Sequence, residues 1–182
     1  MIRKSELNLP NTITISRILA LPFCAYALFK NGGDDSTWRI IAFVLFFLVG
    51  LTDLVDGKVA RSRNTVTEFG KLLDPIADKA LIGTALLGLS ILGILPWWVT
   101  IVILTREIGI TIFRFAVIKN KNGVIPANRG GKIKTTVQNL AAGFYILPLG
   151  SSLYWFRDLF MAVAIVLTIT TGVWYLVEAR KG

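Results

Sequence analysis

The chain has 182 residues, of which 54% are hydrophobic and 17% are charged, and its formal net charge is +9. A soluble globular domain usually carries about 25% charged residues, so this balance indicates a membrane protein and excludes a soluble basic domain that binds nucleic acid. The chain has one cysteine, Cys24, and no histidine. It can therefore form neither an intrachain disulfide nor a thiolate metal cluster.

Apolar runs separated by clusters of charge predict an all-α, polytopic membrane protein. We expect one domain over residues 1–182, with six transmembrane helices and a polar cavity that faces the cytoplasm. The expected spans lie near residues 12–29, 40–60, 72–95, 97–118, 135–150 and 158–177. The sequence lacks the alternation of apolar and polar residues that would indicate the strands of a membrane barrel.

Lysine and arginine are distributed unevenly over the expected loops. The side that receives both termini and the second and fourth loops holds Arg3, Lys4, Lys58, Arg61, Arg63, Lys71, Lys119, Lys121, Arg129, Lys132, Lys134, Arg180 and Lys181. The other side holds only Lys30, Arg39 and Arg157 near its loops. Because cytoplasmic loops carry the excess of these residues, we expect a multi-pass protein of the cytoplasmic membrane with both termini in the cytoplasm.

The segment before the first span predicts the start of a helix. Pro10 breaks the preceding chain, and Asn11 or Thr12 is expected to cap the helix that follows. A capping residue can also contact a ligand, so a binding role for Asn11 stays open at this point.

Four aspartates mark the end of the second expected span and the start of the third. Asp53, Asp56, Asp74 and Asp78 fall within 26 residues of a chain that has only 11 acidic residues. Their spacings, i to i+3 and i to i+4, place each pair on one face of a helix. Carboxylates at the edge of a membrane segment are costly and indicate a functional site. The alternative is that they are ordinary charges at helix ends.

Oxygen ligands without nearby histidine or cysteine suit Mg²⁺, Mn²⁺ or Ca²⁺ rather than structural zinc. Four carboxylates this close together would repel one another strongly unless cations offset their charge. The aspartates are therefore predicted to hold divalent metal ions.

Arg106 and Glu107 lie inside the fourth expected span, and Arg114 follows Arg106 by about two turns on the same face. Neighbours in a helix point in different directions, so Arg106 and Glu107 are not expected to be simply each other's partner. An intramembrane arginine normally faces the interior of the bundle or a wet cavity. Arg106 and Arg114 could bind the phosphate of an anionic substrate, with Glu107 holding one of them; alternatively, Arg106 pairs with a motif aspartate for structural reasons.

The sequence Gly130-Gly131-Lys132-Ile133-Lys134-Thr135 opens the fifth expected span. Two glycines before a helix start, followed by Lys132 and Lys134, are a plausible phosphate site. The spacing of a P-loop is absent. The alternative is a basic anchor on the cytoplasmic side.

The pattern D-x2-D-G-x2-A-R-x8-G-x3-D-x3-D resembles the signature of the CDP-alcohol phosphatidyltransferase family. All eight fixed positions are filled: Asp53, Asp56, Gly57, Ala60, Arg61, Gly70, Asp74 and Asp78. The resemblance covers most of the chain, and it is greatest to the bacterial members that make phosphatidylglycerophosphate. The segment G-K-I-K-T is also similar to theirs.

The resemblance implies roles for these residues. Two ions, Mg²⁺ or Mn²⁺, would be held by Asp53, Asp56, Asp74 and Asp78. The donor CDP-diacylglycerol would be bound by Asn11, Gly57, Ala60, Arg61, Thr67 and Gly70. Since the chain has no histidine, a carboxylate is the remaining candidate for the general base; spacing does not distinguish Asp74 from Asp78, but the resemblance implies Asp78.

The implied reaction is transfer of the phosphatidyl group from CDP-diacylglycerol to sn-glycerol 3-phosphate, with release of CMP. The phosphate of that acceptor would be bound by Arg106, Arg114, Lys132 and Lys134. Phosphatidylglycerol or inositol phosphate as acceptor is the alternative within the family, and a divalent-cation transporter is the remote one. The resemblance also implies a homodimer in the lipid bilayer, and no nucleic-acid partner is expected.

Overall fold

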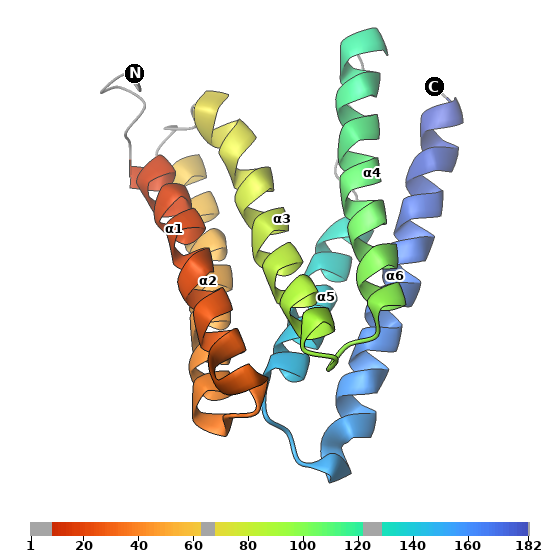
Figure 1. The fold of residues 1–182 in the computed structure, drawn as a ribbon. Coiled ribbons are helices and arrows are strands. Elements are labelled where there is room, and N and C mark those ends of the chain that lie inside the picture. The colour runs from red at the N-terminus through yellow and green to blue at the C-terminus, as the bar shows by residue number, and fades with distance from the viewer. Residues whose placement is uncertain (1–8, 63–67, 122–128, 182) are drawn as a thin grey trace. The chain divides into compact units, whose positions relative to one another are not determined.

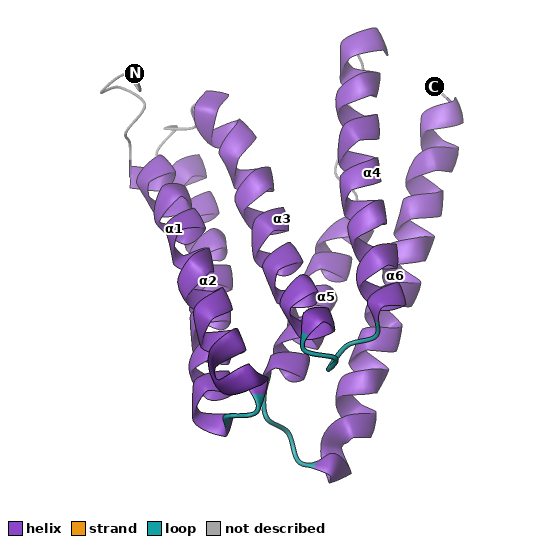
Figure 2. Ribbon diagram, viewed as in Figure 1, coloured by secondary structure: helices purple, strands orange, loops and turns teal. Residues whose placement is uncertain are grey.

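The computed structural model describes the backbone of residues 9–62, 68–121 and 129–181, and the side chains of residues 12–52, 75–113, 130–131 and 133–178. All regular structure within these residues is helical, which confirms the all-α class (Figures 1 and 2). The α-helices are α1 (Leu9–Phe29), α2 (Ser36–Ser62), α3 (Glu68–Ile91), α4 (Trp97–Lys121), α5 (Arg129–Ile146) and α6 (Tyr154–Lys181). Short 3-10 turns at Lys30–Gly33 and Ser151–Leu153 precede α2 and α6.

The helices form two compact units. The first contains α1, α2, α3 and the segment Ile146–Pro148, and the second contains α4, α6 and α5 up to Tyr145. In the first unit, α1 packs against both α2 and α3. A Cβ on Gly88 of α3 would lie 2.7 Å from Leu28 Cδ2 of α1, so glycine at this position lets the two helices approach closely. Leu81, Leu86 and Leu89 of α3 are buried in the same core.

A left-handed turn joins α1 to α2. Asn31 and Gly33 have positive φ values of 54° and 82°, which asparagine and glycine tolerate better than other residues. Asp35 then caps α2, because its Oδ1 accepts hydrogen bonds from the backbone N–H groups of Thr37 at 2.9 Å and Trp38 at 3.2 Å. The hydrogen bond from Trp38, followed by one from the Asn31 side chain, lowers the pKa of Asp35.

An aromatic cluster joins α5 and α6 in the second unit. The ring of Phe144 lies 5.1 Å from that of Phe156 and 4.9 Å from that of Phe160. The Tyr145 hydroxyl donates a hydrogen bond to Asp158 Oδ1 at 2.6 Å. Edge-to-face aromatic pairs of this kind contribute about 0.5–1.5 kcal/mol beyond the area they bury, so they fix the end of α5 against the start of α6.

Two segments, Thr12–Gly33 and Ser151–Glu178, are long and apolar enough to cross a membrane by length and composition. Many large apolar side chains on the helices are exposed, among them Phe23 at 67% and Val166 at 59%. Contiguous exposure of this kind marks an interaction with lipid or with another protein. Trp97, the first residue of α4, and Trp155, the second residue of α6, are also exposed.

Three predicted helix boundaries are wrong. α1 begins at Leu9, so Asn11 and Thr12 lie in its first turn and do not cap it; Pro10 is tolerated there because the first N–H groups of a helix have no partner within it. α3 spans Glu68–Ile91 rather than 72–95. Its end is set by Gly93, whose φ is 71°, the left-handed conformation that commonly ends helices.

The fifth helix spans Arg129–Ile146 rather than 135–150. Pro148 ends it early, because the residue before a proline is disfavoured in the helical conformation. Arg39 of α2 then donates hydrogen bonds to the last carbonyls at this end. Its Nε donates to the Ile146 carbonyl at 2.9 Å and its NH2 group donates to the Leu147 carbonyl at 3.2 Å.

Candidate functional site

The four motif aspartates lie on α2 and α3, which run in opposite directions on either side of residues 63–67 (Figure 1). Asp56 is six residues before the end of α2, and Asp74 is six residues after the start of α3. Asp53 and Asp78 are nine and ten residues from the same helix ends. A helix has 3.6 residues per turn, so each pair lies about two to three turns from the end of its helix, on packed helices of the same unit.

Of these four, only the side chain of Asp78 is described, and it is half-buried. Asp53, Asp56 and Asp74 lie outside the described side chains, as do Asn11, Gly57, Ala60, Arg61, Thr67 and Gly70 of the expected donor site. Among the described side chains, no three histidine, cysteine, aspartate or glutamate residues come together. The backbone places the two aspartate pairs near the adjoining ends of α2 and α3, and carboxylate oxygens are the hard ligands that suit a divalent cation.

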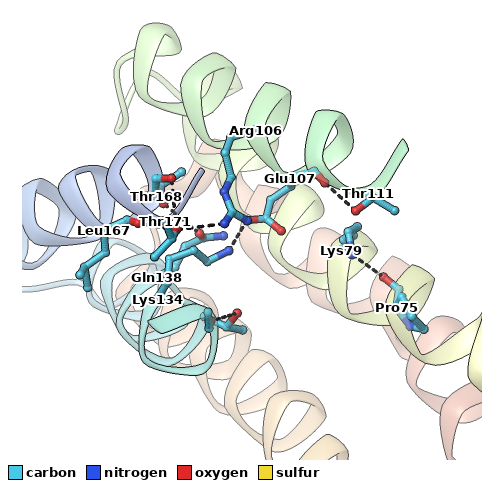
Figure 3. A network of polar contacts seen from close by, with 12 residues as sticks. Pro75, Lys79, Arg106, Glu107, Thr111, Lys134, Gln138, Leu167, Thr168 and Thr171 are labelled. Atoms are coloured by element: carbon cyan, nitrogen blue, oxygen red, sulfur yellow. Dashed lines mark hydrogen bonds and ion pairs between the residues drawn. The ribbon is translucent and has the colours of Figure 1, made fainter. Parts of the chain in front are cut away.

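A second polar cluster lies in the other unit, where α4, α5 and α6 meet (Figure 3). Lys134 of α5 donates a short hydrogen bond to Glu107 Oε1 of α4. Arg106 NH1 lies 3.3 Å from the same oxygen. Lys134 is 2% exposed and Glu107 is 9% exposed. The three side chains thus place two cations beside one carboxylate, with Lys134 and Glu107 buried and Arg106 half-buried.

The side chains of Arg106 and Glu107 meet although the residues are neighbours in the chain. They are not simply each other's partner, as the sequence predicted, because each has a further partner. The arginine side chain is long enough to turn back toward the next residue. Glu107 nevertheless serves two cations, since Lys134 shares its Oε1. The described partners of Arg106 are Glu107 and Thr171 rather than a motif aspartate.

Uncharged residues complete this cluster, and sequence reasoning missed them. Arg106 NH2 donates to Thr171 Oγ1 of α6 at 2.9 Å. Thr168 Oγ1 donates to Gln138 Oε1 of α5 at 3.4 Å, and both residues are fully buried. One signal was present in the sequence: Thr168, Thr171 and Tyr175 recur at helical spacing in an otherwise apolar stretch.

The other expected acceptor residues are Arg114 on α4 and Lys132 on α5, whose side chains lie outside the described ones. Because α5 begins at Arg129, Gly130 and Gly131 are in its first turn and do not precede it. The N–H groups of a first turn point out of the helix end without a partner inside the helix, as an anion site at a helix N-terminus requires.

Comparison with known proteins adds independent evidence. The CDP-alcohol phosphatidyltransferase family matches residues 7–170. The chain is 51% identical over 174 residues to a Mycobacterium tuberculosis protein named "Probable phosphatidylglycerophosphate synthase", with 96% of this chain and 82% of that protein covered.

Two further relatives bear different names. A Bacillus subtilis protein named "CDP-diacylglycerol--glycerol-3-phosphate 3-phosphatidyltransferase" is 39% identical over 177 residues, with 91% of each chain covered. A Streptomyces coelicolor protein named "Cardiolipin synthase (CMP-forming)" is 30% identical over 185 residues, with 96% of this chain and 84% of that protein covered. The family match over most of the chain and these identities confirm the resemblance in the aspartate motif: the chain belongs to the CDP-alcohol phosphatidyltransferase family.

Proposed function

We propose that this enzyme transfers the phosphatidyl group of CDP-diacylglycerol to sn-glycerol 3-phosphate, giving phosphatidylglycerophosphate and CMP. The observation that carries the proposal is the complete aspartate motif in the sequence, with one pair near the end of α2 and the other near the start of α3. The names of the Mycobacterium and Bacillus relatives support this acceptor.

In this proposal, Asp53, Asp56, Asp74 and Asp78 hold two divalent ions, Mg²⁺ or Mn²⁺. The ions, when bound, offset the charge of the pyrophosphate and of the departing CMP. Arg61 binds the donor phosphates, and Gly57 leaves room for the close approach of the nucleotide because it has no Cβ. Asn11, Ala60, Thr67 and Gly70 line the nucleotide side.

The reaction is a substitution at the phosphorus that carries the diacylglycerol. A hydroxyl oxygen of the acceptor forms a bond to this phosphorus, and the bond from phosphorus to the bridging oxygen breaks, so that CMP leaves with that oxygen. The hydroxyl proton passes to the Asp78 carboxylate. Because the chain has no histidine, a carboxylate is the remaining candidate for this role, and the resemblance of the motif to that of the family implies Asp78.

The cluster on α4 and α5 supports an anionic acceptor. Arg106 and Lys134 bring a guanidinium and an ammonium group together beside Glu107, and groups of this kind form charge-assisted hydrogen bonds with a phosphate. Arg114 and Lys132 lie on the same two helices and complete the proposed phosphate site.

Cardiolipin synthesis is the second candidate, because the Streptomyces relative bears that name. Its acceptor, phosphatidylglycerol, is also an anion, and the basic residues do not by themselves discriminate against it. A transporter of divalent cations receives no support from the family, whose members are transferases.

The proposal includes the membrane arrangement. All six helices span the bilayer, the aspartates open to the cytoplasm through a polar cavity, and both termini lie on that side. This topology is supported by the asymmetry of lysine and arginine. The family match over residues 7–170 covers both compact units, which supports one functional domain. We also propose that the enzyme works as a homodimer.

The test is CMP release by the purified protein from CDP-diacylglycerol with Mg²⁺, in the presence of sn-glycerol 3-phosphate, glycerol, phosphatidylglycerol or inositol phosphate. We expect release with sn-glycerol 3-phosphate to exceed that with every other acceptor, and a chelator to abolish it until Mg²⁺ or Mn²⁺ is restored. Fastest release with phosphatidylglycerol would instead identify a cardiolipin synthase.

Replacing Arg106 with glutamine sharpens this test. Loss of a charge-assisted hydrogen bond costs about 1.5–3 kcal/mol, or roughly a ten- to hundredfold rise in KM for sn-glycerol 3-phosphate. The KM for CDP-diacylglycerol should not change. A rise in the donor KM instead would assign Arg106 to the donor side.

A further inference from the structure

Helix α6 carries a stripe of polar residues within a stretch that contains no charged residue. Between Leu159 and Val177 it contains no Asp, Glu, Lys or Arg. Thr168, Thr171, Gly172 and Tyr175 recur at positions i, i+3, i+4 and i+7, which share one face of a helix. Thr168, Gly172 and Tyr175 are buried and Thr171 is half-buried, so this face is turned inward.

The Thr171 hydroxyl holds one side of the Arg106 guanidinium. Thr171 Oγ1 donates its single hydrogen to the Leu167 carbonyl at 2.6 Å. Its lone pairs are therefore left to accept, and it accepts from Arg106 NH2 at 2.9 Å. Glu107 holds the other terminal nitrogen, NH1. With both terminal nitrogens held by different helices, the plane of the guanidinium is fixed (Figure 3).

Gly172 lies against the aliphatic part of the same arginine. A Cβ at this position would lie 3.3 Å from Arg106 Cγ and 3.5 Å from Arg106 Nε. The first distance is shorter than ordinary van der Waals contact, so an alanine would push the arginine side chain away from α6. Glycine in a helix interior costs stability relative to alanine, and here its absence of a side chain makes room for Arg106.

We infer that Thr171 and Gly172 are positioning residues that set the orientation of Arg106 toward the acceptor. The inference rests on the proposed role of Arg106 in binding the acceptor phosphate. A guanidinium recognises an anion through parallel N–H groups in a fixed plane, so its orientation affects affinity as well as its charge. Without the Thr171 hydroxyl, Arg106 is held only by Glu107 and turns away from the phosphate.

The first experiment compares two adjacent threonines. Thr171→Val removes the hydroxyl and keeps the shape of the side chain. The matched control is Thr170→Val, because Thr170 is exposed and its hydroxyl donates only within α6, to the carbonyls of Val166 and Leu167. We expect Thr171→Val to raise the KM for sn-glycerol 3-phosphate about three- to thirtyfold, with kcat and the KM for CDP-diacylglycerol unchanged. Thr170→Val should match the wild type, and Thr171→Ser should restore the KM.

A double-mutant cycle shows whether Thr171 acts through Arg106. In an Arg106→Gln background, Thr171→Val should have no further effect on the KM for sn-glycerol 3-phosphate, because the group that it orients is gone. An equal effect in both backgrounds would overturn the inference. So would a Thr171→Val variant that behaves like Thr170→Val.

The cycle also separates this inference from the proposed function. If Arg106→Gln leaves the KM for sn-glycerol 3-phosphate unchanged, the acceptor site itself is wrong. If Arg106→Gln raises that KM and Thr171→Val does not, only the positioning role is wrong.

The second experiment tests Gly172 by itself. Gly172→Ala should raise the KM for sn-glycerol 3-phosphate without lowering the thermal midpoint, since alanine favours the helix. The control is Gly109→Ala on α4, where no described atom lies within 4 Å of an added Cβ. A Gly172→Ala variant with a normal KM would show that Arg106 tolerates the added methyl and would remove Gly172 from the inference.

Discussion

The aspartate pairs on α2 and α3 differ in construction from the polar cluster of the second unit. We call that cluster, which Arg106, Glu107, Lys134 and Thr171 form, the basic cluster. The aspartates are 26 residues from first to last and lie on two helices joined by a short connection. The basic cluster joins Arg106 to Thr171, 65 residues apart, and Glu107 to Lys134, 27 residues apart. Local spacing therefore determines the first group, whereas packing of three helices determines the second.

The two regions also manage charge differently. Four carboxylates repel one another, so they need a bound cation to come close together. In the basic cluster, Glu107 offsets part of the charge of Arg106 and Lys134 inside the protein. We therefore expect substitutions in the aspartate region to affect catalysis without loss of the fold, and substitutions in the basic cluster to affect both.

The largest effect is expected at Asp78. Asp78→Asn keeps the shape of the side chain but removes the proposed base, so kcat for CMP release should fall about a hundred- to ten-thousandfold. Thermal unfolding in detergent should stay close to that of the wild type. The matched control is Asp34→Asn, an exposed carboxylate of the connection between α1 and α2. Normal turnover by Asp78→Asn would remove Asp78 from the mechanism.

Glu107→Gln should lower stability as well as acceptor affinity. It leaves Lys134, which is 2% exposed, without the carboxylate that it contacts. Breaking a buried ion pair in this way costs about 3–5 kcal/mol. We expect a lower thermal midpoint and a higher KM for sn-glycerol 3-phosphate. Glu178→Gln, at an exposed position near the end of α6, is the control and should change neither.

A double variant separates these two effects of Glu107. Adding Lys134→Met to Glu107→Gln removes the buried cation together with its partner, so part of the thermal midpoint should return. The KM for sn-glycerol 3-phosphate should remain high, because the basic group is still missing. If the second substitution lowers the midpoint further, Lys134 is stabilised by contacts other than that with Glu107.

The smallest effect is expected at Asp35, which lies in neither region. Its pKa is lowered in the folded protein, so its stabilising contribution is present above its ordinary pKa and is lost as the pH falls through the folded value. Asp35→Ala should lower the thermal midpoint slightly at neutral pH and should weaken the fall of the midpoint in acid. Asp34→Ala serves as the control. Identical acid dependence in the wild type and Asp35→Ala would show that the cap does not contribute.

The helices themselves were largely predictable, because long apolar runs between charged clusters indicate helices in this class of protein. The errors fell where single residues end a helix. Gly93 ends α3, and Pro148 ends α5, each four residues before the expected boundary. At both places the local effect of one residue on the backbone overrides the hydrophobicity of the residues beyond it.

The residues of the candidate site also differ in how well the sequence predicts them. Arg106, Glu107 and Lys134 stood out in the sequence because charges inside an apolar run are rare. Gln138 did not, since uncharged polar residues in a membrane helix are common and its partner lies on another helix. Thr171 had only the weaker signal of its helical spacing with Thr168 and Tyr175. The contact of Gly172 with Arg106 had no sequence signal, because it depends on how closely α6 approaches α4.

The burial of Lys134 has a practical consequence for chemical labelling. An amine-directed reagent reacts with a lysine only when solvent reaches its nitrogen, and Lys134 is 2% exposed while its nitrogen contacts Glu107. Reaction at this lysine should therefore lag behind reaction at Lys30, which is only half-buried, in the same molecule. The ratio of the two modified peptides, measured by mass spectrometry over time, therefore reports the rate at which α4 and α5 transiently separate.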